Sequence, residues 1–146
     1  MRETGILVSC SDYHIFKKMH LTRAQAMDKY LSIVRAALDH GIRPRCHFED
    51  ITRADFYGFV VPFAEELMLL SKESGLPIKI RACDTMGYGV TYYGAALPRS
   101  VPGIIYGLQH YSDVQSEYLE WHGHNDFYKA VANASAAWLY GACGVN

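Results

Sequence analysis

The chain has 146 residues and a formal net charge of -1, with 14 Lys and Arg residues against 15 Asp and Glu residues, so its length suits one domain and excludes a second full one. Hydrophobic residues make up 50% of the chain and aromatic residues 13%, which excludes intrinsic disorder. The balanced charge argues against a nucleic-acid partner, because proteins that bind nucleic acid carry an excess of Lys and Arg.

Short β-rich segments alternate with longer helical patterns, which is typical of a parallel sheet with crossover helices. In chain order the sequence predicts a strand at 6–10, a helix at 22–40, a strand at 43–48, a helix at 54–73, a strand at 78–83, a helix at 102–111, a strand at 118–122, a helix at 127–140 and a strand at 142–145. A long Gly- and Tyr-rich loop is expected at 88–98.

The helix at 22–40 has the clearest boundaries. Its apolar residues recur every three or four positions, as they do on the buried face of a helix. The sequence Thr22-Arg23-Ala24-Gln25 fits a capping box at its start, and Gly41 fits a left-handed stop at its end. In the helix at 54–73, Pro62 should cause a kink or mark a restart, because its ring removes one backbone donor.

Five strands of this kind fit either an open doubly wound sheet or part of a (β/α)8 barrel, and periodicity does not separate the two. A complete barrel has eight strands and about 250 residues. A barrel segment of this length would therefore lack roughly three strands at its front and the end of its last strand. The chain stops within a predicted strand, with no helix after it, which favours such a fragment.

Membrane segments and disulfides are not indicated. No apolar run approaches the roughly 20 residues that span a bilayer, and the apolar stretch near the start is too short for a secretory signal. We therefore expect a cytoplasmic protein that has no membrane partner. Cys10, Cys46, Cys83 and Cys143 have no Cys-x-x-Cys spacing, so we expect buried free thiols.

Reactive side chains gather at the carboxyl end of nearly every predicted strand. They are Ser11, Asp12 and His14 after the first strand, Arg45, His47, Glu49 and Asp50 on the second, Asp84 and Thr85 on the third, and His122, His124, Asn125 and Asp126 on the fourth. In parallel α/β folds the loops at the strand carboxyl ends converge on one crevice. The sequence therefore predicts one shared site.

His122 and His124 form the most informative pair in this set. They alternate on one face of an extended segment, so both imidazoles can reach one metal ion. The alternative is a pair of hydrogen-bonded histidines in the core or in a loop.

Arg45, His47 and Glu49 share one face of the second predicted strand. This spacing fits a cation and a carboxylate aimed into one pocket, and it fits a structural ion pair equally well. Asp84 and Thr85 could bind a ligand or cap a turn. The sequence contains no Gly-x-Gly-x-x-Gly, P-loop or Gly-x-Ser-x-Gly motif.

Five short motifs follow one another in an order that is specific, although each is weak alone. They are Ser11-Asp12-Tyr13-His14, Glu49-Asp50, Asp84-Thr85-Met86-Gly87, His122-Gly123-His124-Asn125-Asp126 and Ala130-Val131-Ala132-Asn133-Ala134. With these motifs the chain resembles the 2-isopropylmalate synthase and homocitrate synthase group, the acyl-CoA condensing members of the metal-dependent (β/α)8 lyase superfamily. The resemblance covers nearly the whole chain and implies that 1–146 is a single partial catalytic domain, about strands four to eight of the barrel.

The resemblance also implies an activity and roles for particular residues. The activity is that of an acyltransferase of amino-acid biosynthesis, which condenses acetyl-CoA with a 2-oxo acid. His122 and His124 would ligate a divalent ion, Zn, Mn or Mg, that polarises the ketone. Thr85 would bind the carboxylate of the 2-oxo acid. Arg45 and Glu49 match catalytic pocket residues, and Arg45 would also offset the charge of the bound anion. Relatives are commonly dimeric, so the resemblance implies a homodimer.

The chain departs from the family pattern in three places. The Asp-Arg-Glu signature of the first barrel strand has no counterpart, so we expect the chain alone to bind metal weakly and to be inactive. The loop at 88–97 looks longer than its counterpart in relatives. Phe127-Tyr128-Lys129 follows the His-x-His-Asn-Asp motif, where small residues are common.

These departures leave the substrate open, and a Re-face citrate synthase that uses oxaloacetate is one candidate. A lyase or aldolase of the same superfamily is an alternative, although Asn125 after the second histidine favours condensation. A catalytically inactive metal- or metabolite-binding domain is the other alternative.

Overall fold

The structure is a computed structural model that describes residues 1–146. Its strands are β1 (Glu3–Ser9), β2 (Arg43–Glu49), β3 (Lys79–Asp84), β4 (Leu119–Gly123) and β5 (Gly144–Val145). Its longer helices are α1 (Arg23–Asp39), α2 (Val61–Ser74), α3 (Val101–Tyr111) and α4 (Ala130–Leu139). Four short helical turns complete the chain: η1 (Tyr13–Lys18), η2 (Ile51–Arg53), η3 (Phe56–Val60) and η4 (Ser116–Tyr118).

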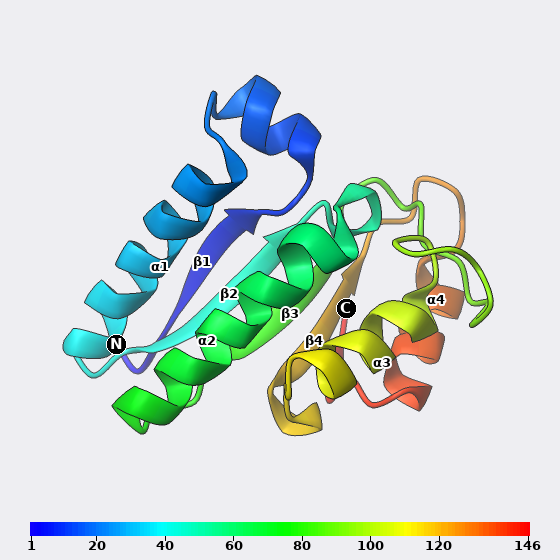
Figure 1. Ribbon diagram of the computed structural model, residues 1–146. Helices are drawn as coiled ribbons and strands as arrows, with labels where there is room; N and C mark the ends of the chain where they lie inside the picture. Colours follow the sequence, from blue (N-terminus) through cyan, green and yellow to red (C-terminus); the bar gives the residue numbers. More distant parts are fainter.

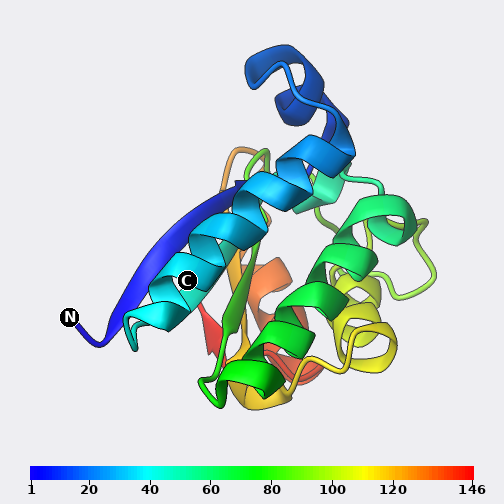
Figure 2. The same cartoon turned by 60° about the vertical axis from the view of Figure 1, so that its left-hand side comes forward.

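The strand order distinguishes the two architectures that the sequence left open. The sheet has the order β1-β2-β3-β4-β5, and every neighbouring pair is parallel. A doubly wound sheet reverses its order at a switch point, whereas a barrel adds each strand beside the previous one. Because the crossovers keep one hand, they place the helices on one face, and Figures 1 and 2 show α1 and α2 side by side there. The fold is therefore a barrel-like parallel α/β sheet.

The two faces of the sheet differ in chemistry. The helix-covered face is apolar and forms one core with the helices, and its strand residues are Ile6, Val8, Cys46, Phe48, Ile80, Ala82, Leu119 and Trp121. The opposite face carries charged and polar side chains of β2, β3 and β4, and its Leu7 is 60% exposed. This open face corresponds to the interior of a barrel, where loops at one end surround a site.

The predicted start and end of α1 are confirmed to within one residue. Gln25 N donates to Thr22 Oγ1 over 3.2 Å and Thr22 N donates to Gln25 Oε1 over 2.9 Å, which completes the capping box. Gly41 has a positive φ of 68°, as a left-handed helix stop requires. The prediction of a helix at 54–73 is confirmed as an α-helix from Val61 onward, and the π-type turn η3 directly precedes it. Pro62 lies in the first turn of α2, where a missing N–H is tolerated, and the helical backbone continues from η3 into α2 without a break.

The last helix starts later than predicted. Tyr128 has a positive φ of 57°, which does not fit a right-handed helix, and α4 begins at Ala130. Asn125 Oδ1 accepts a hydrogen bond from Ala130 N over 3.2 Å, which fixes this start. The segment 88–98 is a long loop without helix or paired strand, as predicted, apart from one isolated bridge between Val90 and Ser100. No helix combines the length and the apolar character that crossing a membrane needs.

All four cysteines are free thiols, as predicted, but Cys143 is exposed. Burial raises the pKa of Cys46 and of Cys83 to about 12, and it raises the pKa of Cys10 well above the ordinary value. We expect a thiol reagent at pH 8 to label Cys143 in the native whole protein that contains this sequence, and to spare the other three. Peptide mapping measures this, and fast native labelling of a buried thiol would contradict the packing described here.

Candidate functional site

The loops that follow β1 to β4 all lie at the top of Figure 1, where the strands end. We call this end of the sheet the carboxyl edge. It carries most of the side chains that the sequence predicted to share a site, with Arg45 as an exception, and the first group of them surrounds Glu49.

Glu49 lies at the end of β2 with three side chains around its carboxylate. Ser9 Oγ at the end of β1 donates a short hydrogen bond to Glu49 Oε2. The turn η1 returns over the edge and places His14 Nδ1 3.3 Å from Oε2, and Lys18 Nζ 3.6 Å from Oε1. The side chains of Glu49 and His14 are 15% and 13% exposed. Of these partners, the sequence singled out only His14, and it gave His14 no role.

Asp50 connects the first three strands. Its carboxylate is fully buried, accepts from Ser11 Oγ, and pairs with Arg53, whose Nε lies 2.9 Å away. Its backbone N donates to Thr85 Oγ1 over 2.8 Å. Because Thr85 Oγ1 accepts this bond, its own hydroxyl hydrogen is available to donate to an oxygen of a ligand. Thr85 is thus held at the carboxyl edge with its hydroxyl hydrogen free to donate a hydrogen bond.

Asp84 is a turn-forming residue in the structure. Its buried carboxylate accepts hydrogen bonds from Thr52 Oγ1 at 2.7 Å and from the backbone N of Tyr88 and of Gly89, both at 2.9 Å. These bonds shape the loop after β3 and link it to η2. Of the two roles that the sequence left open for Asp84, its geometry is that of a turn cap.

His122 and His124 lie at the end of β4 with their ring centroids 5.1 Å apart and their planes at 84°. Rings on opposite faces of the strand would lie much farther apart, so both are on one face. His122 Nδ1 lies 3.1 Å from Asn146 Oδ1. Two imidazoles suit a divalent transition ion, which takes further ligands as well. The chain contains no group of three His, Cys, Asp or Glu side chains that could hold a metal ion, so metal binding by His122 and His124 stays a prediction.

Arg45 is not brought to the carboxyl edge. Its guanidinium pairs with Glu3 at 2.6 Å and Glu120 at 3.3 Å, in a charged network on the open face that includes Lys79 and Arg81. Its register partners are Gly5 and Lys79, nearer the amino ends of the strands. This geometry is that of the structural ion pair that the sequence left as an alternative, and a catalytic role for Arg45 stays a prediction.

His47 lies between Arg45 and Glu49 on the same face of β2. Burial and the charges of Arg81 and Arg45 lower the pKa of His47 below its ordinary value. The surroundings of His47 therefore favour the neutral form of its imidazole.

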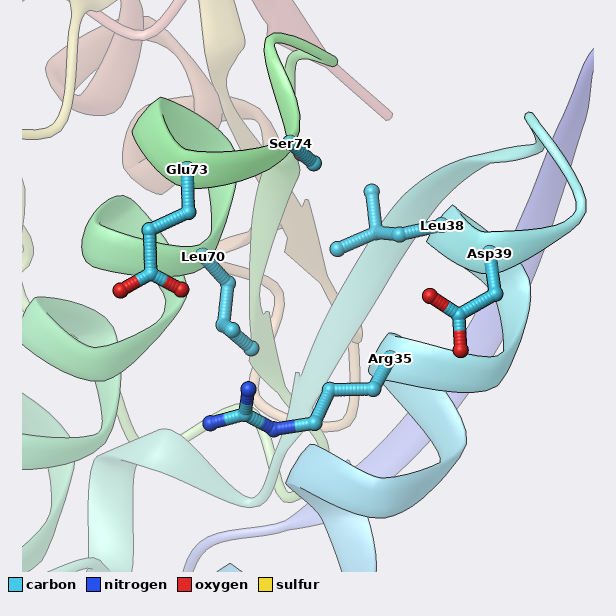
Figure 3. Close-up of a pocket in the computed structure, with 6 residues that line it drawn as sticks. All are labelled: Arg35, Leu38, Asp39, Leu70, Glu73 and Ser74. Carbon is cyan, nitrogen blue, oxygen red and sulfur yellow. The ribbon is translucent and has the colours of Figure 1, made fainter.

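A pocket between α1 and α2 lies far from these residues along the sheet. Figure 3 shows its lining, which comes from the last turns of the two helices, and its volume is about 200 Å³. Since α1 leads into β2 and α2 into β3, this pocket lies at the amino ends of the strands. Ligand sites of parallel α/β folds lie at the opposite end, so we assign it no part in the site.

Comparison with known proteins places the chain in a family. The HMGL-like family matches residues 1–146. The citrate (Re)-synthase of Clostridium kluyveri is 66% identical over 146 residues, which is 100% of this chain and 32% of that protein. The 2-phosphinomethylmalate synthase of Streptomyces hygroscopicus is 44% identical over 98% of this chain and 32% of its own length. The chain thus spans about a third of the curated relatives named here.

A solved structure supports the fold. The hydroxymethylglutaryl-CoA lyase of Pseudomonas aeruginosa matches with a TM-score of 0.73 at 19% identity, over 99% of this chain and 45% of that chain. This similarity shows the fold alone, and it agrees with the barrel-like strand order. The relatives confirm the predicted resemblance to the acyl-CoA condensing synthases, and the chain belongs to the HMGL-like family.

Proposed function

We propose that this chain is the part of a condensing enzyme's catalytic barrel that binds the 2-oxo acid and carries two ligands of a divalent metal ion. One observation carries the proposal. The rings of His122 and His124 share one face at the carboxyl edge that also holds Thr85 and Glu49, in a chain 66% identical to a citrate (Re)-synthase over its full length. We infer that 1–146 forms about strands four to eight of the barrel.

We infer that the substrates are acetyl-CoA and a 2-oxo acid that bears a second acidic group, with oxaloacetate first. The support is chemical. Citrate has three carboxylates, and 2-phosphinomethylmalate has a phosphinate beside its two carboxylates, so the synthases with those names make products with three acidic groups. Condensation with acetyl-CoA supplies one of the three, and the 2-oxo acid therefore brings two.

We infer a different role for each side chain at the carboxyl edge. Thr85 donates its hydroxyl hydrogen to the carboxylate next to the ketone. Glu49, with Ser9 and His14 fixing its carboxylate, is the candidate to move a proton of the acetyl group. His122 and His124 fit as two of the three protein ligands that a catalytic zinc-type ion takes, and a bound divalent ion would polarise the ketone.

The test is an assay of free CoA on the whole protein that contains this sequence. We expect CoA release and citrate formation with acetyl-CoA and oxaloacetate, at least tenfold faster than with pyruvate, 2-oxoisovalerate or 2-oxoglutarate, and loss of both after chelation. Cleavage of hydroxymethylglutaryl-CoA, measured in parallel, is the control for a lyase. No CoA release from any of the four acids would contradict the proposal.

A further inference from the structure

A pocket of about 330 Å³ lies at the carboxyl edge, lined by Tyr88, Arg99, Phe127 and Lys129. These side chains come from the loop after β3 and the loop after β4. Both segments are places where the sequence was expected to depart from the family pattern, one by its length and the other by Phe127-Tyr128-Lys129. None of the four has a role in the site described above.

The pocket combines two aromatic rings with two cations. The rings of Tyr88 and Phe127 lie 5.8 Å apart at 38°. Arg99 Cζ lies 5.6 Å from the centroid of Tyr88, and Lys129 Nζ lies 5.6 Å from the centroid of Phe127. Arg99 also donates a short hydrogen bond to the carbonyl of Thr52, which fixes the guanidinium beside the pocket.

Neither cation has a carboxylate partner. The ion pairs of the chain involve other Lys, Arg and His residues and leave Arg99 and Lys129 out. Asp126, the acidic residue of the same loop as Lys129, pairs with neither. Two unneutralised cations on one pocket raise the local concentration of anions, and a guanidinium offers a fork of donors that matches carboxylate and phosphate oxygens.

The pocket adjoins the histidine pair. Gly87 precedes Tyr88, and a Cβ added at Gly87 would lie 3.1 Å from the carbonyl oxygen of His124 and 3.5 Å from Asp126 N. The loops after β3 and β4 are therefore packed together next to His124. The pocket is thus formed by the two loops that also carry Thr85 and His124.

We propose that this pocket is an oxyanion subsite in which Arg99 and Lys129 bind a carboxylate or phosphate group, with Tyr88 and Phe127 covering the adjacent part of the ligand. The identity of the ligand rests on the proposed function. The oxyanion is then either the second acidic group of the 2-oxo acid or a phosphate of acetyl-CoA. Both sources offer the same chemistry to the pocket, and binding measurements separate them.

The experiment compares the whole protein with its Arg99→Met and Lys129→Met variants, which remove one charge each and keep an unbranched apolar side chain. Lys29→Met is the matched control, because Lys29 is exposed on α1 and has no ion pair. Calorimetric titration uses three probes: inorganic phosphate, adenosine 3′,5′-bisphosphate for the CoA source, and tricarballylate for the acid source. We expect about 10- to 100-fold weaker binding of the matching probe in both pocket variants and no change in the control.

Loss confined to adenosine 3′,5′-bisphosphate assigns the subsite to CoA, and loss confined to tricarballylate assigns it to the 2-oxo acid. Unchanged binding of every probe in both variants, or no binding by the parent protein, overturns the subsite. These titrations need no turnover. If the parent protein releases no CoA but both variants lose probe binding, the subsite is supported and the proposed function is contradicted. If turnover is normal and probe binding is unchanged in both variants, the proposed function is supported and the subsite is contradicted.

Discussion

Replacement of His122 or His124 by alanine should lower the rate of CoA release by the whole protein by about 10²- to 10⁴-fold, because a Lewis-acid ion contributes several kcal/mol and each 1.4 kcal/mol is tenfold in rate. The fold should survive. His124 is exposed and His122 is half-buried, and substitutions at such positions change stability by about 0.5 kcal/mol or a little more. Metal content by mass spectrometry and steady-state CoA release give the two measurements.

His40→Ala is the matched control. His40 is an exposed residue at the end of α1, away from the carboxyl edge, so its loss should leave both metal content and rate unchanged. Excess metal should restore part of the rate in each single variant, since one imidazole remains, and much less in the double variant. Single variants that keep the parent's metal content and rate would show that the pair is not a ligand pair.

The shared face of His122 and His124 was predictable because their spacing is local. Two residues that alternate along an extended segment lie on one face whatever the rest of the chain does, and the rings of His122 and His124 do so. The position of Thr85 and Glu49 at the carboxyl edge was predictable for a related reason, since Glu49 ends β2 and Thr85 directly follows β3.

Arg45 shows where this reasoning stops. The two-residue period places Arg45 and Glu49 on the same face of β2. It does not say how far each residue lies from the carboxyl edge. They are four positions apart in β2, which is about 13 Å at 3.3 Å per residue. At this distance from the carboxyl edge, Arg45 forms ion pairs with Glu3 of β1 and Glu120 of β4. An ion pair between strands depends on their register, which a single sequence does not reveal.

The partners of Glu49 were missed for a different reason. His14 and Lys18 reach Glu49 because η1 returns over the end of β1, and a π-type turn has no strong signature in sequence. The strand order is a similar case, because periodicity reports which face of a strand is buried and not which strand lies beside it. The capping box at Thr22 is the contrasting example, in which all the interacting atoms lie within four residues.

Asp84→Ala should destabilise the fold by about 3–5 kcal/mol, because it removes a buried acceptor and leaves several donors without a partner. The donors are Thr52 Oγ1 and the backbone N–H groups of Tyr88 and Gly89, at 2.7, 2.9 and 2.9 Å. Gly89 packs closely on this carboxylate, since a Cβ there would lie 2.9 Å from Asp84 Oδ2. Urea unfolding, followed by the fluorescence of the buried Trp121, measures the loss.

Two further variants isolate the cause. Asp84→Asn keeps the shape and one acceptor oxygen but turns the other atom into a donor that faces an N–H group, so we expect a loss of about 1–3 kcal/mol. Asp28→Ala removes an exposed carboxylate of α1 and should change stability by less than about 0.5 kcal/mol. Equal stability of Asp84→Ala and Asp28→Ala would show that the loop after β3 does not depend on this carboxylate. The loop also carries Thr85 and Tyr88. The Asp84→Ala protein should therefore bind the 2-oxo acid more weakly than the parent protein, even in buffer without urea, where it is folded.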